Sequence, residues 1–374
     1  MSSTALHSEK ETHCQPQQQH TPEDAVVAAS SSAAGVWAGL TEVERTSLLV
    51  AFARWQGAQQ HAWPDGSPWY TDPLGAYFVR SCIPTEAQQR MLDWAKQRAK
   101  ISNFVAVRTA ELDAQIAAAL GTSSSSGSTA GTGGPAAAGE KRSPRDIQQM
   151  VLLGAGTDTR AWRLSWPPGF KVFEVDSAAV LSFKAWVLSG AAAAAAAAAG
   201  ASGEQQQQQQ QQVEGAVLPQ LRCEQRVEVV ADASQPAELW GRLLSCGLDG
   251  ARPVVWLLEG FIGYLTVPAS NALLTHLAAV SAPGSRVLIT APPTPDRLGE
   301  AAAADTEAAV PAGAAAAAAE APKLQLHHST FEAPTETLNR LAAAGWRGCQ
   351  LLTEQQLAAK YQVVHAQPIL IGSV

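Results

Sequence analysis

Residues 151–176 read VLLGAGTDTRAWRLSWPPGFKVFEVD, and this stretch decides the fold. The apolar run 151–153 predicts a buried strand, and the small residues 154–156 predict a tight turn directly after it. Residues 171–175 predict a second short strand, which Asp176 closes. A strand, a glycine turn, a helix and an acid-terminated strand are typical of the first half of a nucleotide-binding unit.

Strands and helices alternate along the rest of the chain. Apolar runs predict further strands at 226–230, 253–260, 285–292 and 368–374. Apolar residues at three- and four-residue spacing predict helices at 43–56, 85–120, 177–189, 235–247, 268–281 and 333–346. This order predicts an α/β fold, a Rossmann-like, doubly wound, mostly parallel sheet of seven strands. The two early helices precede the sheet and are expected to form an N-terminal helical cap.

Low-complexity segments interrupt this pattern at three places. Residues 121–140 are rich in Ser and Gly, residues 190–215 hold an alanine tract followed by glutamines, and residues 299–322 are alanine-rich. Each falls between predicted elements, so we interpret them as loop insertions, which cost little entropy. A disordered tail is expected over residues 1–35, followed by a single domain over 36–374. Within it the cap is placed at 41–120 and the core at 145–374.

Composition excludes several classes of function. The formal net charge of −7 and the pI near 5.6 give no general attraction to nucleic acid or to an anionic membrane. No apolar run approaches the roughly 20 residues that span a bilayer. The N-terminus resembles neither a secretory signal nor a transit peptide, so a cytoplasmic location is expected. The five scattered cysteines match no zinc spacing, which predicts reduced thiols and no metal site.

Three acids follow three of the predicted parallel strands: Asp176, Asp232 and Glu259. Ligands of open α/β sheets bind beyond the carboxyl ends of the strands. An anionic rim repels a pyrophosphate but suits a cationic nucleoside with amine and hydroxyl donors. In the pattern G-x-G-x-x-G the last position is Thr159, where a dinucleotide fold takes a small residue, and Tyr264 has no nearby lysine to complete a hydride-transfer site. These features favour S-adenosylmethionine over NAD.

Several motifs, in order, resemble the leucine carboxyl methyltransferase family, and most closely its bacterial-type branch of S-adenosylmethionine-dependent O-methyltransferases. They are MVLLGAGTDTRAWRL, KVFEVDSAAVLSFK, VEVVADAS, ARPVVWLLEGFIGYL and SAPGSRVLI, preceded by TSLLVAFAR, YTDPLGAYFV and VRTAELDAQI. The resemblance runs from about Thr46 to Tyr361, outside the three insertions. One departure is Val50, which stands where the members that act on a protein phosphatase carry a lysine, so their substrate is not implied here.

The resemblance implies a role for each residue at the motif positions. The backbone of Gly154, Ala155 and Gly156 lies against the methionine part of the cofactor, and Asp176 binds the ribose diol. Asp232 and Ala233 flank the adenine. Glu259 lies near the methionine amino group, Arg108 pairs with the cofactor carboxylate, and Tyr264 lines the substrate side. From the residues alone, Arg108 also fits a helix-surface charge, and each acid also fits an ordinary loop residue. No general base is identified.

The mechanism expected from these features needs little more than positioning. A carboxylate acceptor is already ionised at neutral pH and requires no base, whereas a hydroxyl acceptor requires one. The methyl acceptor, small molecule or protein, is not identified by the sequence, nor is the oligomeric state. Two alternatives stay open: an NAD(P)-dependent oxidoreductase on a similar sheet, and a non-catalytic S-adenosylmethionine-binding or interaction protein.

Overall fold

A computed structural model describes residues 15–16, 42–82, 99–122, 146–200, 220–291 and 333–374. Its centre is one sheet in the order β1-β4-β3-β2-β5-β6-β8-β7. The strands are β1 (Gln15–Pro16), β2 (Gln149–Leu153), β3 (Lys171–Asp176), β4 (Gln225–Val230), β5 (Val255–Leu258), β6 (Arg286–Thr290), β7 (Arg347–Leu352) and β8 (Ile369–Ser373). Apart from the two-residue β1, the sheet has the seven strands expected, and six of them lie at the predicted positions.

The five neighbouring strands β4, β3, β2, β5 and β6 run parallel. At one end of the sheet, β8 lies between β6 and β7 and runs antiparallel to both. The register places Leu153 beside Val175 and Leu152 beside Leu257. One step further along the strands, the Gly154 turn therefore begins between Asp176 and Glu259. The predicted doubly wound, mostly parallel α/β fold is confirmed, and its switch point lies where the glycine turn is.

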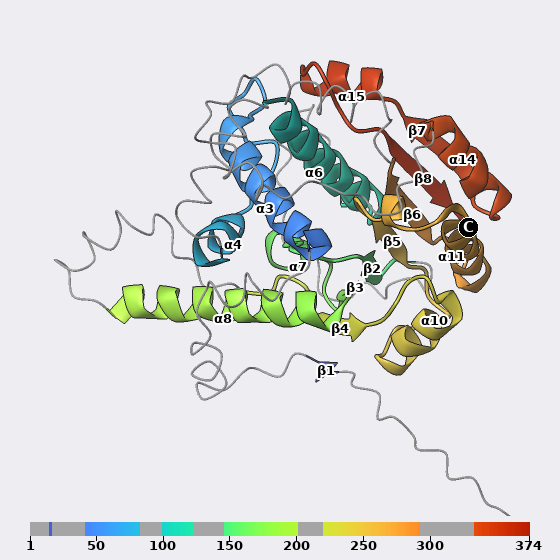
Figure 1. Ribbon diagram of the computed structural model, residues 1–374, viewed down its shortest axis with the longest axis horizontal. Coiled ribbons are helices and arrows are strands. Elements are labelled where there is room, and N and C mark those ends of the chain that lie inside the picture. Colours follow the sequence, from blue (N-terminus) through green and yellow to red (C-terminus); the bar gives the residue numbers. More distant parts are fainter. Residues whose placement is uncertain (1–14, 17–41, 83–98, 123–145, 201–219, 292–332) are drawn as a thin grey trace, which may run out of the picture.

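Two apolar layers cover the two faces of the sheet, because successive side chains of a strand alternate between faces. Met150 and Leu152 point into one cluster, and Val151 and Leu153 point into the other. The first layer is made by α3 (Glu42–Gln60), α4 (Gly75–Cys82), α6 (Ala99–Ala119), α7 (Arg160–Arg163), α8 (Ala178–Gly200) and α15 (Glu354–Tyr361); the second by η1 (Ile262–Tyr264), α10 (Pro236–Ser245), α11 (Val267–Val280) and α14 (Pro334–Ala343). Figure 1 shows α3, α4 and α6 gathered at one side of the sheet, where the sequence predicts the cap.

The structure differs from the expected elements at several places. The helix expected at 177–189 continues through the alanines of the tract to Gly200 as α8, because alanine has the highest helix propensity. Between β2 and β3 only the four residues of α7 are helical. Neither β7 nor α15 is among the expected elements. The half-exposed pattern of β7 explains the omission, since an edge strand gives no continuous apolar run.

Several expectations fall wholly or mostly outside the described residues: the tail 1–35, the insertions 121–140 and 299–322, and the glutamines of 190–215. The limits given for cap and core therefore stay a prediction. Cys223 and Cys349 are free thiols, as expected. Cys246 is disulfide-bonded, so the expectation of reduced thiols is wrong there, because pairing depends on proximity in the fold rather than on spacing. Across the described helices, no segment is long and apolar enough to cross a membrane.

Candidate functional site

The glycine turn after β2 is held by the end of β3. Gly154 and Gly156 adopt φ values of +69° and +45°, a region that favours glycine. The amides of Gly154 and Ala155 donate to the carbonyl of Val175 at 3.0 and 3.1 Å. The amide of Gly156 donates to Asp176 Oδ2 at 2.7 Å. The predicted residues of this part of the site therefore lie together, with the Asp176 carboxylate fixed against the turn.

Asp176 also has a local role. Its Oδ1 accepts from the amide of Ser177 at 2.7 Å, at the start of α8. Each carboxylate oxygen thus holds one backbone amide, which is the ordinary loop role that the sequence left open. A carboxylate offers about four acceptor positions, so two backbone amides do not by themselves exhaust its acceptor capacity.

Arg108 and Glu259 meet at the end of β5. Arg108 is buried on α6, and its Nε donates to Glu259 Oε1 at 2.8 Å. Its Nη1 donates to Gln367 Oε1 at 3.2 Å, across 259 residues of chain. Gly260 follows with φ +61°, and a Cβ there would lie 3.5 Å from Arg108 Nη1. The alternative of a helix-surface charge is wrong for Arg108, which belongs to the rim that the sequence predicts.

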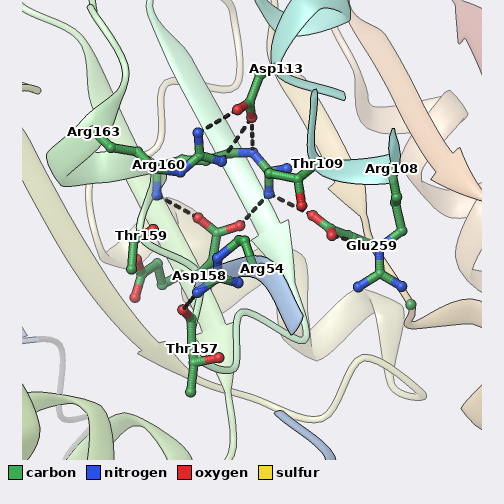
Figure 2. A network of polar contacts seen from close by, with 12 residues as sticks. Arg54, Arg108, Thr109, Asp113, Thr157, Asp158, Thr159, Arg160, Arg163 and Glu259 are labelled. Carbon is green, nitrogen blue, oxygen red and sulfur yellow. Dashed lines mark hydrogen bonds and ion pairs between the residues drawn. The ribbon is translucent and has the colours of Figure 1, made fainter. Parts of the chain in front are cut away.

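A second arginine holds the other oxygen of Glu259. Arg160 is 1% exposed at the start of α7, and its Nη1 donates to Glu259 Oε2 at 2.6 Å and also contacts Asp158. Its Nε donates to Asp113 Oδ1 at 2.8 Å, and Arg163 binds the same Asp113. Figure 2 shows this row of alternating charges reaching from α6 across α7 to the end of β5.

These ion pairs decide the charge states at the rim. Burial favours the neutral carboxyl and so raises the pKa of Glu259, but Arg160 and Arg108 outweigh burial and hold that pKa well below its usual range. Burial lowers the pKa of Arg160, whereas Asp158, Glu259 and Asp113 raise it well above its ordinary value. Glu259 is therefore ionised at neutral pH, and its carboxylate can accept a hydrogen bond from a further cationic group.

The cap contacts the same turn from the other side. Arg54 of α3 binds Asp72, and its Nη2 donates to the carbonyl of Thr157 at 2.6 Å. The hydroxyl of Thr157 donates to the carbonyl of Ser47 at 2.8 Å. Thr159 donates to Asp72 Oδ1 at 2.9 Å. The residue that fills the third glycine position of the signature thus ties the turn to the cap.

The remaining predicted residues lie around this centre. Asp232 is exposed after β4, and its Oδ1 accepts from the amide of Ser234 at 2.8 Å, while Ala233 is buried. Tyr264 is half-buried at the end of η1, which follows β5. Asp176, Asp232 and Glu259 all follow the carboxyl ends of parallel strands, as the sequence predicts. Their roles toward a ligand stay a prediction.

Sequence reasoning missed Arg160, Asp158 and Asp113 as members of the site. Asp158 and Arg160 stand in the quoted GAGTDTR motif and Asp113 in AELD, but nothing in a single sequence pairs residues 47 or 99 positions apart. Among the described residues, no group of three or more His, Cys, Asp or Glu side chains is arranged to hold a metal ion.

The fold and rim define a Rossmann-like α/β protein with arginine-paired carboxylates around its glycine turn. Residues 136–278 match the family model of leucine carboxyl methyltransferase, and this match supports the family that the motifs predicted.

Several relatives are similar to parts of this chain. A "Putative S-adenosyl-L-methionine-dependent methyltransferase" of Mycobacterium avium is 39% identical over 145 residues, covering 39% of this chain and 38% of the relative. One of the same description from Parafrankia is 32% identical over 258 residues, covering 67% of this chain and 64% of the relative. The chain thus spans less than two thirds of the length of either. A DUF574 family protein from Streptomyces avermitilis has a TM-score of 0.43 at 13% identity, covering 81% of this chain and 97% of that one.

Proposed function

We propose that this chain binds S-adenosylmethionine and transfers its methyl group to an oxygen atom of an acceptor, as an S-adenosylmethionine-dependent O-methyltransferase. The observation that carries the proposal is the rim itself. Three carboxylates stand at the carboxyl ends of parallel strands, at the same edge of the doubly wound sheet as the glycine turn, and the buried Arg108 and Arg160 pair with one of them. The family match and the names of the relatives support the same class.

The donor set fits this cofactor chemically. S-adenosylmethionine carries an ammonium, a sulfonium, a carboxylate, two ribose hydroxyls and an adenine amine. Each donor group of the cofactor has an acceptor in the rim. Asp176 accepts from the ribose hydroxyls, Asp232 from the adenine amine and Glu259 from the ammonium. Arg108 offers a planar fork of donors to the carboxylate. A pyrophosphate, by contrast, meets the carboxylates of Asp176 and Asp232, and the nearby arginines Arg108 and Arg160 are already paired with Glu259.

The bound cofactor supplies a methyl group that its sulfonium has already activated, so the chain's own residues chiefly position the reactants. The turn and Asp176 orient the nucleoside, and Arg108 with Glu259 orients the amino-acid end. The cap contacts made by Arg54 and Thr159 keep water from the turn on one side. A carboxylate acceptor needs no base, and Tyr264 is the residue proposed for the substrate side.

Thermal unfolding with three ligands tests the cofactor. S-adenosylmethionine is expected to raise Tm, with about 2.7 kcal/mol of stabilisation at a concentration of 100 Kd, whereas NAD and NADP leave Tm unchanged. Arg108→Gln is expected to abolish the shift, while Arg242→Gln, at an exposed ion pair, keeps it. Equal shifts with NAD would contradict the cofactor assignment.

Transfer of a labelled methyl group tests the reaction. Candidate acceptors with a carboxylate or a hydroxyl are incubated with the chain and labelled cofactor. A methyl ester releases volatile methanol in mild base, whereas a methyl ether does not, so the base lability of the product separates the two oxygen acceptors. Binding without transfer to any acceptor would favour the non-catalytic alternative.

A further inference from the structure

The ring of Phe261 lies against the glycine turn. A Cβ built on Gly154 would fall 2.5 Å from Phe261 Cδ2 and 3.3 Å from both Cε2 and Cγ of the same ring. Gly154 is thus required by φ +69° and also by close approach of this ring. Phe261 is half-buried and packs against the apolar layer of η1, α10, α11 and α14.

The backbone around Phe261 is fixed, so the ring's position follows from the fold. The amide of Gly260 donates to Thr290 Oγ1 at 2.7 Å, and Gly260 turns sharply at φ +61°. The carbonyl of Phe261 accepts from the amide of Tyr264 at 3.0 Å as η1 begins. These contacts return the chain from the end of β5 toward the end of β2.

The order of bonds in the proposed cofactor locates its sulfur. The sulfonium lies between the ribose and the amino-acid end. Asp176, proposed for the ribose, bonds Gly156 of the turn. Glu259, proposed for the ammonium, stands two residues before Phe261. A ligand that joins these two carboxylates passes the turn where the ring lies, and its sulfur falls in the middle of that path.

We propose that the aromatic ring of Phe261 contacts the sulfonium and makes the site prefer the charged cofactor over its neutral thioether product. An aromatic face attracts a ligand cation through its quadrupole. In the transfer, an acceptor oxygen lone pair forms the bond to the methyl carbon and the sulfur–carbon pair returns to sulfur. The positive charge is lost, and with it the attraction to the ring, so the product is held less tightly than the cofactor. This inference rests on the proposed function.

Calorimetric titration of the full chain tests it with S-adenosylmethionine and S-adenosylhomocysteine, which differ in the methyl group and the charge. In Phe261→Leu, affinity for the charged cofactor is expected to fall by about threefold to tenfold, while affinity for the thioether stays within about twofold. Phe261→Tyr keeps a ring and is expected to keep the preference. Trp240→Leu, a half-buried aromatic of the same apolar layer on α10, controls for general loosening.

The outcomes separate this inference from the function on which it rests. Selective loss of the charged ligand in Phe261→Leu, restored in Phe261→Tyr, supports the ring as the sulfonium contact. Equal loss of affinity for both ligands in Phe261→Leu, or no loss of affinity, overturns the sulfonium contact. Binding of S-adenosylmethionine by the wild-type chain would still support the proposed cofactor in that case. If the wild-type chain binds neither ligand, the proposed function itself fails. Tm of each ligand-free variant is measured alongside, so that unfolding is not mistaken for lost affinity.

Discussion

At the scale of single residues, the rim combines two kinds of carboxylate. Glu259 is bound by Arg108 and Arg160, so its charge is neutralised before any ligand arrives. Asp176 accepts from the backbone amides of Gly156 and Ser177. Removing one partner from a buried ion pair costs about 3–5 kcal/mol, whereas removing a backbone acceptor costs about 1–3 kcal/mol. Asp176 is therefore the acid whose ligand role is easier to separate from its structural role.

We expect Asp176→Asn to keep much of the fold and lose cofactor affinity. The amide oxygen can still accept from Gly156, but the charge is gone and the amide nitrogen is a donor facing ribose donors. Charge-assisted hydrogen bonds contribute about 1.5–3 kcal/mol each, so affinity should fall at least about tenfold. Calorimetric titration beside a urea unfolding curve measures both effects. Intact affinity with reduced stability would mean that Asp176 serves only the turn.

At the scale of elements, the sequence predicted what continuous patterns encode. The fully buried runs of β2 and β5, the glycine turn and the acids after β3, β4 and β5 were predictable, because strand burial and turn chemistry are local. The half-exposed β7, the brief α7 and the pairing of Arg160 with Glu259 were not. Each depends on neighbours that only the tertiary fold supplies.

In helix α8, the buried side chains that the structure describes lie before the alanine tract. Among them are Leu181, Val187 and Leu188, and Gly190 is exposed. We expect deletion of residues 191–212 to leave Tm and cofactor affinity nearly unchanged, since this low-complexity tract has no amphipathic pattern and a change of loop length costs little closure entropy. Thermal unfolding and titration check this. Leu181→Ala, in the packed part, is the contrast and should cost about 2–5 kcal/mol. Loss of soluble protein on deletion would show that the tract packs.

At the scale of the molecule, the cap and the sheet are joined through the glycine turn. Arg54 and Asp72 come from the cap, Thr157 and Thr159 from the turn, and Asp113 of α6 reaches Arg160 of α7. Most of these groups are buried, so the junction consists of buried ion pairs and hydrogen bonds as well as apolar contacts. Whatever loosens the cap also loosens the turn that is proposed to hold the cofactor.

Arg54→Met tests this junction. The substitution keeps an apolar stem but removes the guanidinium that links Asp72 to the carbonyl of Thr157, leaving a buried charge without its main partner. We expect a loss of about 3–5 kcal/mol in the free energy of unfolding. Hydrogen exchange should rise in α3 and in residues 154–159, while amides of α11 and α14, on the opposite face, keep their relative protection. Arg242→Met, at an exposed ion pair of α10, should change neither measurement. An equal rise in exchange over both faces would contradict a local junction, because it would mean that the cap and the whole sheet open as one unit.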